Sequence, residues 1–212
     1  MTFELKNVTV TLDEHPLFAP LTVQLDKGQI GTIMGPSGSG KSTLLAAISG
    51  TLPPTFDCTG DIRLNGRSLL DVPVESRQVG ILFQDDLLFP HLNVYQNLVF
   101  ALPRGLSKSE QRERICSGLI DADMDRFDHR DVATLSGGQR ARISLLRTLL
   151  AEPKLILLDE PFAKLDLQLR GQFRDFVFNR ITDLNIPALL VTHDPADHPD
   201  TGLLIELETA HA

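Results

Sequence analysis

The 212 residues predict an α/β protein in which helices flank a mixed or parallel sheet. Two short apolar runs, residues 155–158 and 188–191, each lie between helical segments, and buried parallel strands have this continuous apolar character. A glycine-rich turn joins a further strand, residues 29–34, directly to a helix over residues 41–49. The length suits one domain, with room for a small inserted subdomain.

The N-terminal part is predicted to consist of antiparallel β strands beside this core. Residues 3–10 and 21–25 alternate apolar and polar side chains, as half-buried strands do. Further strands are expected at residues 60–64 and 79–83, and Asn65-Gly66 is a turn signal after the first of them.

The middle of the chain has a different character. Residues 86–134 contain no comparable strand pattern, and residues 108–120 have helical spacing. We expect one domain over residues 1–212, with a helical subdomain, 86–134, inserted into an α/β core made of 1–85 and 135–212. After the insertion we expect the following elements in order: a helix over 137–150, a strand over 155–159, a helix over 166–184, strands over 188–192 and 202–207, and a frayed tail over 208–212.

The composition limits the possible partners. The formal net charge is −8, from 20 basic and 28 acidic residues, so no nucleic-acid partner is expected, because binding to a nucleic-acid backbone depends on clustered cations. Cys58 and Cys116 are predicted to be free thiols. No apolar run approaches the ~20 residues of a membrane-spanning helix, so a membrane role would require a partner.

A phosphate-binding loop is predicted between the strand that ends at Met34 and the helix that begins at Lys41. The segment matches GxxxxGK[ST] at every fixed position and has the required strand–loop–helix context. Glycines let successive backbone N–H groups face phosphate oxygens, and the helix N-terminus adds positive potential. The matching residues are Gly35, Pro36, Ser37, Gly38, Ser39, Gly40, Lys41 and Ser42.

Two carboxylates, Asp159 and Glu160, end the apolar strand 155–159. A buried strand that ends in Asp beside a phosphate loop commonly holds Mg²⁺, and an adjacent Glu can polarise an attacking water. By itself the pattern is equally compatible with solvated acids at a strand end; the phosphate loop upstream favours the catalytic interpretation.

The pentapeptide of residues 135–139, Leu-Ser-Gly-Gly-Gln, lies between these two motifs. It could simply be a Ser N-cap opening a helix, but in this order and position it resembles the signature of ABC ATPases. Gln84 resembles the Q-loop residue of that family, residues 163–166 resemble the D-loop, and His193 resembles the switch histidine. The resemblance extends over essentially the whole chain and implies an ATPase with the P-loop NTPase fold.

The resemblance implies a role for each matching residue. ATP is the implied nucleotide, and Mg²⁺ is the implied metal, surrounded by Ser42, Gln84 and Asp159. Lys41 and Gln84 contribute to catalysis, Glu160 acts as the base and His193 contacts the γ-phosphate. Residues 35–43, including Thr43, bind the triphosphate, while the signature binds the γ-phosphate held by a second copy of the chain in a head-to-tail dimer; its residues are Ser136, Gly137, Gly138 and Gln139.

The sequence departs from the family pattern in two places. Where the family usually has an aromatic residue that stacks on adenine, this chain has Leu12, so apolar contact from Leu12 or Phe18 is the expected substitute. Ala163 occupies a D-loop position that normally carries Ser.

Residues 85–94, Asp-Asp-Leu-Leu-Phe-Pro-His-Leu-Asn-Val, resemble a stretch of bacterial importer ATPases. Leu87, Leu88 and Phe89 are candidates to line a groove for a helix of a membrane permease; the alternative is that they belong to the core of the helical subdomain. Several segments are similar to the YnjD-type ATPases, and others to thiamine and iron importer subunits. This resemblance implies an importer subunit at the cytoplasmic face of a bacterial inner membrane, attached to a permease and served indirectly by a periplasmic solute-binding protein. The alternatives are an ABC ATPase of DNA repair or translation, an inactive cassette, and a P-loop kinase or small GTPase.

Overall fold

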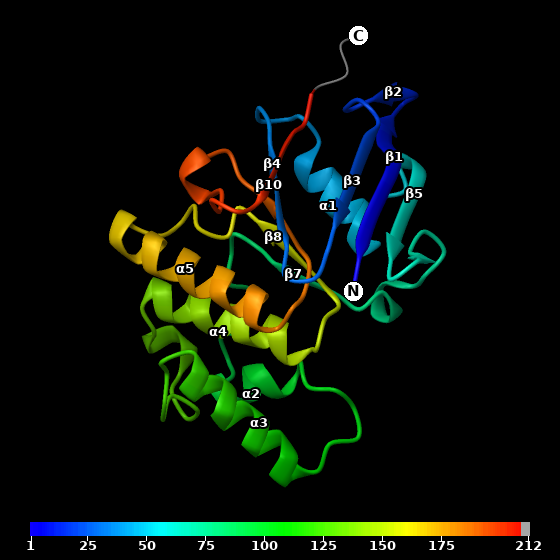
Figure 1. Ribbon diagram of the computed structural model, residues 1–212. Coiled ribbons are helices and arrows are strands. Elements are labelled where there is room, and N and C mark those ends of the chain that lie inside the picture. The colour runs from blue at the N-terminus through cyan, green and yellow to red at the C-terminus, as the bar shows by residue number, and fades with distance from the viewer. Residues whose placement is uncertain (209–212) are drawn as a thin grey trace. The chain divides into compact units, whose positions relative to one another are not determined.

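A computed structural model describes residues 1–208 (Figure 1). The chain forms two compact units, and it crosses between them several times. The first unit comprises residues 1–81, 154–160 and the part described from residue 178 onward, and the second comprises residues 82–153 and 161–177. Of the predicted tail, residues 209–212 lie outside the described residues. The boundaries 86–134 for a functional subdomain remain a prediction.

The first unit contains an antiparallel sheet built on its longest strand, β1 (Phe3–Leu12). β1 pairs antiparallel with each of three other strands and buries apolar side chains along one face. Positive φ angles at Asn65 and Gly66 form the predicted turn between the last two strands. The other strands are β2 (His15–Pro16), β3 (Leu21–Leu25), β5 (Phe56–Leu64) and β6 (Arg67–Ser68).

A second sheet of the first unit has the strand order β10-β4-β9-β8-β7. β10, β4, β9 and β8 are paired parallel, and the continuous apolar runs of β8 and β9 are buried throughout, as the sequence predicts for parallel strands. The strands are β4 (Ile30–Met34), β7 (Val79–Leu82), β8 (Leu155–Asp159), β9 (Ala188–Val191) and β10 (Leu203–Glu206).

Helix α1 (Lys41–Ser49) begins at the end of the glycine-rich loop and packs against β1 and β8. Its buried residues Leu44, Leu45 and Ile48 join one apolar core with side chains of both sheets. The loop after β4 is therefore anchored at both ends by buried structure.

The second unit is mainly helical, and α2, α3 and α4 pack on one another around a separate apolar core (Figure 1). α3 and α4 both begin with a capping box, in which a Ser N-cap and the side chain three residues later satisfy each other's backbone N–H. Leu88 is only 9% exposed and belongs to this core, so the expectation that it lines a docking groove is wrong. The helices are α2 (Val94–Val99), α3 (Lys108–Asp121), α4 (Gly137–Leu150) and α5 (Leu167–Asp183), the last of which continues into the first unit.

Candidate active site

The glycine-rich loop follows β4 and ends at the N-terminus of α1, as predicted. Gly40 caps the helix with φ +88°, and a Cβ at this position would lie 2.9 Å from Cδ1 of the buried Phe18. Gly38 has φ +82° with open space around it. Because other residues resist these dihedrals, the glycines allow the loop to turn its backbone N–H groups toward an anion.

Lys41, the fixed lysine of this loop, is folded over it. Its ammonium group donates hydrogen bonds to the carbonyl oxygens of Gly35, at 2.9 Å, and Pro36, at 2.8 Å. The residue is 8% exposed, so its charge is held close to the loop. Ser39 Oγ is buried and has no hydrogen-bond partner within residues 1–208. A buried hydroxyl without a hydrogen-bond partner costs stability. The loop therefore offers one hydroxyl whose hydrogen-bonding potential residues 1–208 leave unsatisfied.

Ser42 connects the loop to the end of β8, because its hydroxyl donates a hydrogen bond to Asp159 Oδ1 at 3.3 Å. Burial raises the pKa of the Asp159 carboxyl, and the neighbouring Glu160 raises it further, whereas the Ser42 hydrogen bond and the charge of Lys41 lower it. The structure thus brings together two of the three oxygen donors predicted for Mg²⁺. A carboxylate and a hydroxyl are the hard oxygen ligands that this ion prefers.

Glu160 occupies a strained backbone position directly after β8. Its φ is +46°, in the left-handed region that non-glycine residues rarely adopt, and its N–H donates to Val191 O at 3.0 Å. His193 follows β9, and its Nδ1 lies 3.2 Å from Glu160 Oε1. The His193 side chain is 62% exposed, so the ring is accessible from solvent while it contacts the carboxylate.

The loop that carries His193 is fixed by a buried polar contact that no sequence pattern indicated. Thr192 Oγ1 donates to Asp197 Oδ2 at 2.8 Å, and both residues are 2% exposed. Thr192 Oγ1 also accepts a hydrogen bond from the N–H of Asp194. In the sequence, the contact is marked only by Asp197, an acid four residues after His193, and such a spacing is too common to indicate a contact.

β4, β9 and β8 are neighbours in the parallel sheet, so their carboxyl ends lie at one edge. The phosphate loop, His193 and the Asp159–Glu160 pair follow these three strands in that order. Ligands of open α/β sheets bind at this edge, and the first unit thus gathers a lysine, a hydroxyl, two carboxylates and an imidazole there.

The remaining predicted residues belong to the second unit. Gln84 follows β7 by two residues and is exposed, and residues 163–166 precede α5. Ser136 is exposed and is the N-cap of α4; its hydroxyl accepts a hydrogen bond from Gln139 N, and Gln139 Oε1 accepts one from Ser136 N. The signature is thus a capping box in the structure, and its roles toward a nucleotide remain predictions.

The two candidates for contact with the base differ in accessibility. Leu12 ends β1 and is half-buried, opposite Phe56 of β5. Phe18 is fully buried against the phosphate loop, so the expectation that Phe18 offers a surface to a base is wrong. Leu17, which no sequence motif indicated, is half-buried and also borders Gly40.

Together the fold and the phosphate loop define a P-loop nucleoside triphosphatase. The family described as ABC transporter matches residues 18–163. The chain belongs to this family, and it is an ABC-type ATPase, the ATP-binding subunit of an ABC transporter.

Individual relatives agree with this assignment. The chain is 46% identical over 202 residues to the uncharacterized ABC transporter ATP-binding protein YnjD of Escherichia coli (strain K12), covering 95% of this chain and 93% of that protein. It is 37% identical to the spermidine/putrescine import ATP-binding protein PotA of Mesoplasma florum, covering 90% of this chain and 54% of that one. The Fe(3+) ions import ATP-binding protein FbpC of Escherichia coli O157:H7 is 34% identical, at 92% and 55% coverage. The chain thus spans about half the length of these two import proteins.

A solved structure gives the same fold. The ATP-binding cassette MJ0796, described as a dimer in a post-hydrolysis state bound to ADP and Pi, superposes with a TM-score of 0.78. It is 29% identical in sequence, and the match covers 97% of this chain and 94% of that chain.

Proposed function

We propose that this chain powers a bacterial importer by hydrolysing ATP as a head-to-tail pair of identical subunits bound to a membrane permease. The observation that carries the catalytic part is the convergence of Lys41, Asp159, Glu160 and His193 at one edge of the parallel sheet. The importer assignment is supported by relatives whose names describe import of polyamines or iron.

In this mechanism the chain's own residues bind the triphosphate and prepare water for attack. The phosphate loop and Lys41 hold the β- and γ-phosphates. Glu160 accepts a proton from the attacking water, and His193, 3.2 Å from Glu160, orients this carboxylate and reaches the γ-phosphate. The left-handed backbone at Glu160 is a local strain of the kind that accumulates at catalytic sites.

In this proposal Ser42 and Asp159 would hold Mg²⁺, and Gln84 would be a third ligand when ATP is bound. The half-buried carboxylate and the hydroxyl, which already share a hydrogen bond, fit an ion that keeps several water and phosphate ligands. The ion would neutralise charge on the phosphates during hydrolysis. A bound cation would act against the burial that raises the pKa of the Asp159 carboxyl.

Two residues of the signature, Ser136 and Gly137, support the participation of a second copy of the chain. A Cβ at Gly137 would meet nothing within 4 Å and the residue does not have a positive φ, so its own chain does not require glycine there. An external group that approaches closely would require it. Together with the exposed Ser136 hydroxyl at a helix N-terminus, this supports binding of the γ-phosphate held by the partner chain. MJ0796 is described as dimeric with ADP and Pi bound.

The permease is proposed to bind an exposed apolar patch, Leu87, Phe89 and Phe100, on the second unit. These side chains are 55%, 40% and 68% exposed, and the rings of Phe89 and Phe100 lie 5.2 Å apart. Contiguous exposed apolar side chains commonly mark protein interfaces. Within residues 1–208 no helix is long and apolar enough to cross a membrane. A periplasmic solute-binding protein would act through the permease.

Glu160→Gln tests the catalytic proposal. We expect ATP and Mg²⁺ to bind normally while hydrolysis falls about 100-fold or more, the scale of a lost general base. Trapped ATP should also convert the variant into a stable dimer, because the nucleotide bridges two chains. Steady-state hydrolysis and sedimentation with and without ATP measure both effects.

Glu75→Gln is the matched control, since Glu75 is exposed on a short helical turn of the same unit. It should hydrolyse ATP within about twofold of wild type, as exposed substitutions away from a site usually change little. Hydrolysis by Glu160→Gln within a few-fold of wild type would exclude Glu160 as the base. A monomer at saturating ATP would contradict the shared site.

A further inference from the structure

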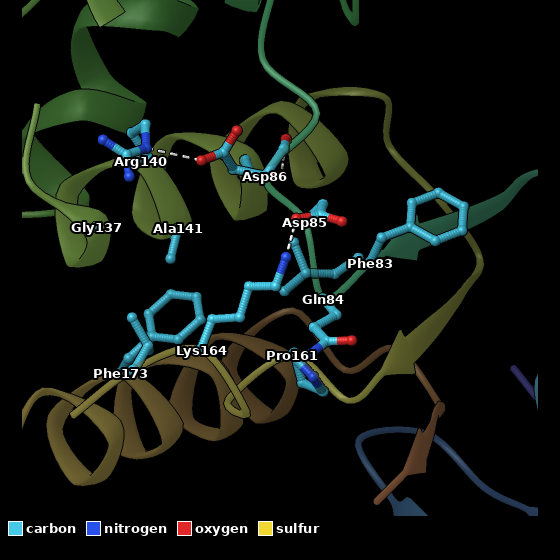
Figure 2. Close-up of a pocket in the computed structure, with 13 residues that line it drawn as sticks. Phe83, Gln84, Asp85, Asp86, Gly137, Arg140, Ala141, Pro161, Lys164 and Phe173 are labelled. Carbon is cyan, nitrogen blue, oxygen red and sulfur yellow. Dashed lines mark hydrogen bonds and ion pairs between the residues drawn. The ribbon is translucent and has the colours of Figure 1, made fainter. Parts of the chain in front are cut away.

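An acidic doublet, Asp85-Asp86, follows Gln84 and links it to two other segments of the second unit (Figure 2). Asp86 Oδ2 accepts a hydrogen bond from Arg140 Nε at 2.8 Å, and Asp85 forms an ion pair with Lys164. Arg140 lies in α4, four residues after Ser136, and Lys164 lies in the predicted D-loop. The doublet therefore joins the segment after Gln84 to the signature helix and to the D-loop.

The backbone of the same segment is fastened to α4 as well. Ser144 Oγ donates to Asp86 O at 2.9 Å, and Arg147 donates to Asp86 O at 3.1 Å and to Leu87 O at 2.9 Å. Residues 140, 144 and 147 have the spacing of one helix face. One face of α4 thus holds both the main chain and the acidic side chain directly after Gln84.

Gln84 itself makes no side-chain hydrogen bond within residues 1–208, and it is exposed. Its position therefore depends on the neighbours that hold its backbone. Leu87 has φ +47°, a conformation that persists only where surrounding contacts fix it. The contacts from α4 hold the residues before and at Leu87, while Asn97 of α2 accepts a hydrogen bond from Phe89 N on the other side.

We propose that Asp86 and Arg140 are positioning residues, which set the place of Gln84 relative to the signature helix. The inference rests on the proposed function, in which Gln84 acts at the nucleotide of its own chain and Ser136 at that of the partner. The pair then makes both residues move together, so that events at one nucleotide site reach the other. The Asp85–Lys164 pair has the lesser role, because its side chains are 66% and 53% exposed, against 33% and 38% for Asp86 and Arg140, and solvent screens it more.

The test is a double-mutant cycle with Asp86→Asn and Arg140→Gln in the full chain. Asn retains an oxygen that can accept the hydrogen bond from Leu88 N, so the turn is preserved. Each single variant should lower kcat about tenfold, since small displacements of a catalytic group are costly, and should raise the half-saturating Mg²⁺ concentration. Binding of ATP without Mg²⁺ should stay within about twofold. The double variant should be no worse than Arg140→Gln alone, because that change already removes the contact with Asp86 together with the Nη1 hydrogen bond to Leu135 O.

Two further variants make the readout specific. Asp123→Asn breaks another ion pair of α4, between Asp123 and Arg142 at 3.0 Å, away from Gln84, and should leave kcat unchanged. Arg140→Lys, which can still pair with Asp86, should recover most of the lost kcat.

Three results would overturn the inference. The first is an unchanged kcat and an unchanged Mg²⁺ dependence in both single variants, and the second is a loss of kcat in the double variant that equals the sum of the single losses. The third is a loss of kcat accompanied by a lower melting temperature and weaker ATP binding without Mg²⁺. Gln84→Ala distinguishes a failure of the proposed role of Gln84 from a failure of the positioning role of Asp86 and Arg140. A normal kcat in Gln84→Ala would overturn both the proposed role of Gln84 and this inference, whereas a low kcat there with a normal Asp86→Asn would overturn the inference alone.

Discussion

In the proposed function, the side chain at position 12 contacts the base of the nucleotide and contributes to how strongly the base is held. Leu12 has methyl groups but no ring face, and Phe18 is fully buried, so most of the affinity should come from the triphosphate. We therefore expect GTP to bind within about tenfold of ATP, since one stacking contact contributes about 1–3 kcal/mol. Introducing a ring with Leu12→Tyr should tighten ATP binding about five- to a hundredfold on the same scale. Competition binding with both nucleotides measures these differences.

Thr11→Tyr is the control for this prediction, because successive side chains of a strand point to opposite faces, and Thr11 precedes Leu12 in β1. It should leave ATP affinity unchanged. A preference for ATP above a hundredfold in the wild type, or equal effects of the two tyrosines, would show that another side chain holds the base.

Individual site residues differed in how far the sequence could reveal them. Lys41, Asp159 and Glu160 could be predicted as site residues because a short motif at a strand end carries its own chemical meaning. The left-handed φ of Glu160 has no such signal, since the residue type does not favour it. The Asp86–Arg140 pair was also missed, because its partners are separated by 54 residues and only packing brings them together.

At the scale of elements, the pairing of β1 with β5 depends on one glycine. The register of this pair changes between Lys6 and Thr9, and Gly60 lies opposite with φ +92°. A Cβ at Gly60 would be 2.4 Å from Asn7 O, and neither backbone can move away without breaking the pairing. Gly60→Ala should therefore lower the free energy of unfolding by about 2–4 kcal/mol, combining left-handed strain with a steric clash.

Gly66→Ala separates strain from clash, because Gly66 has φ +78° but a Cβ added there would meet nothing within 4 Å. Its cost should be about 1–2 kcal/mol, the left-handed strain alone. Denaturant unfolding of both variants gives the comparison. Equal losses would mean that the close approach to Asn7 contributes nothing.

The sequence predicted the long helices well, found only residues 60–64 of the nine-residue strand β5, and missed the shortest elements. The helix over 41–49, the helix over 137–150 and the strand over 155–159 have the predicted ends, because each is bounded by glycine, proline or a capping residue. α2 has six residues, too few for a periodic pattern, and it was missed although Asn93 and Gln96 form a capping box at its start. The two-residue strands β2 and β6 exist only through their pairing with β1 and β5, which no local pattern reveals.

At the scale of the whole molecule, the motifs divide between the two units. The phosphate loop, Asp159, Glu160 and His193 belong to the first unit, whereas Gln84, the signature and the D-loop belong to the second. The chain enters the second unit at residue 82 and again at residue 161, so Gln84 and the D-loop each lie within a few residues of a crossing. In the proposed function, a change in nucleotide state that shifts Gln84 would act on the unit that carries the exposed apolar patch, and this would couple the two proposed sites energetically.

Two adjacent residues test whether that patch binds the permease. Phe89 is 40% exposed, so Phe89→Asp should leave the isolated subunit folded and able to hydrolyse ATP. It should nevertheless abolish association with the permease, because an unpaired charge would be buried in an apolar interface. The expected loss of binding free energy is several kcal/mol, on the order of that at the strongest interface hot spots. Co-purification with the membrane subunits, circular dichroism and hydrolysis by the isolated chain measure the three properties.

Leu88→Asp is the matched contrast, since Leu88 is 9% exposed and packs in the core of the second unit. The same charge one residue earlier should lower the melting temperature sharply, because it is buried within the chain itself and not at an interface. Because both variants introduce an aspartate, comparing Phe89→Asp with Leu88→Asp distinguishes a docking residue from a core residue. Normal co-purification of Phe89→Asp would exclude the patch as the docking site, and unfolding of Phe89→Asp would assign Phe89 to the core beside Leu88.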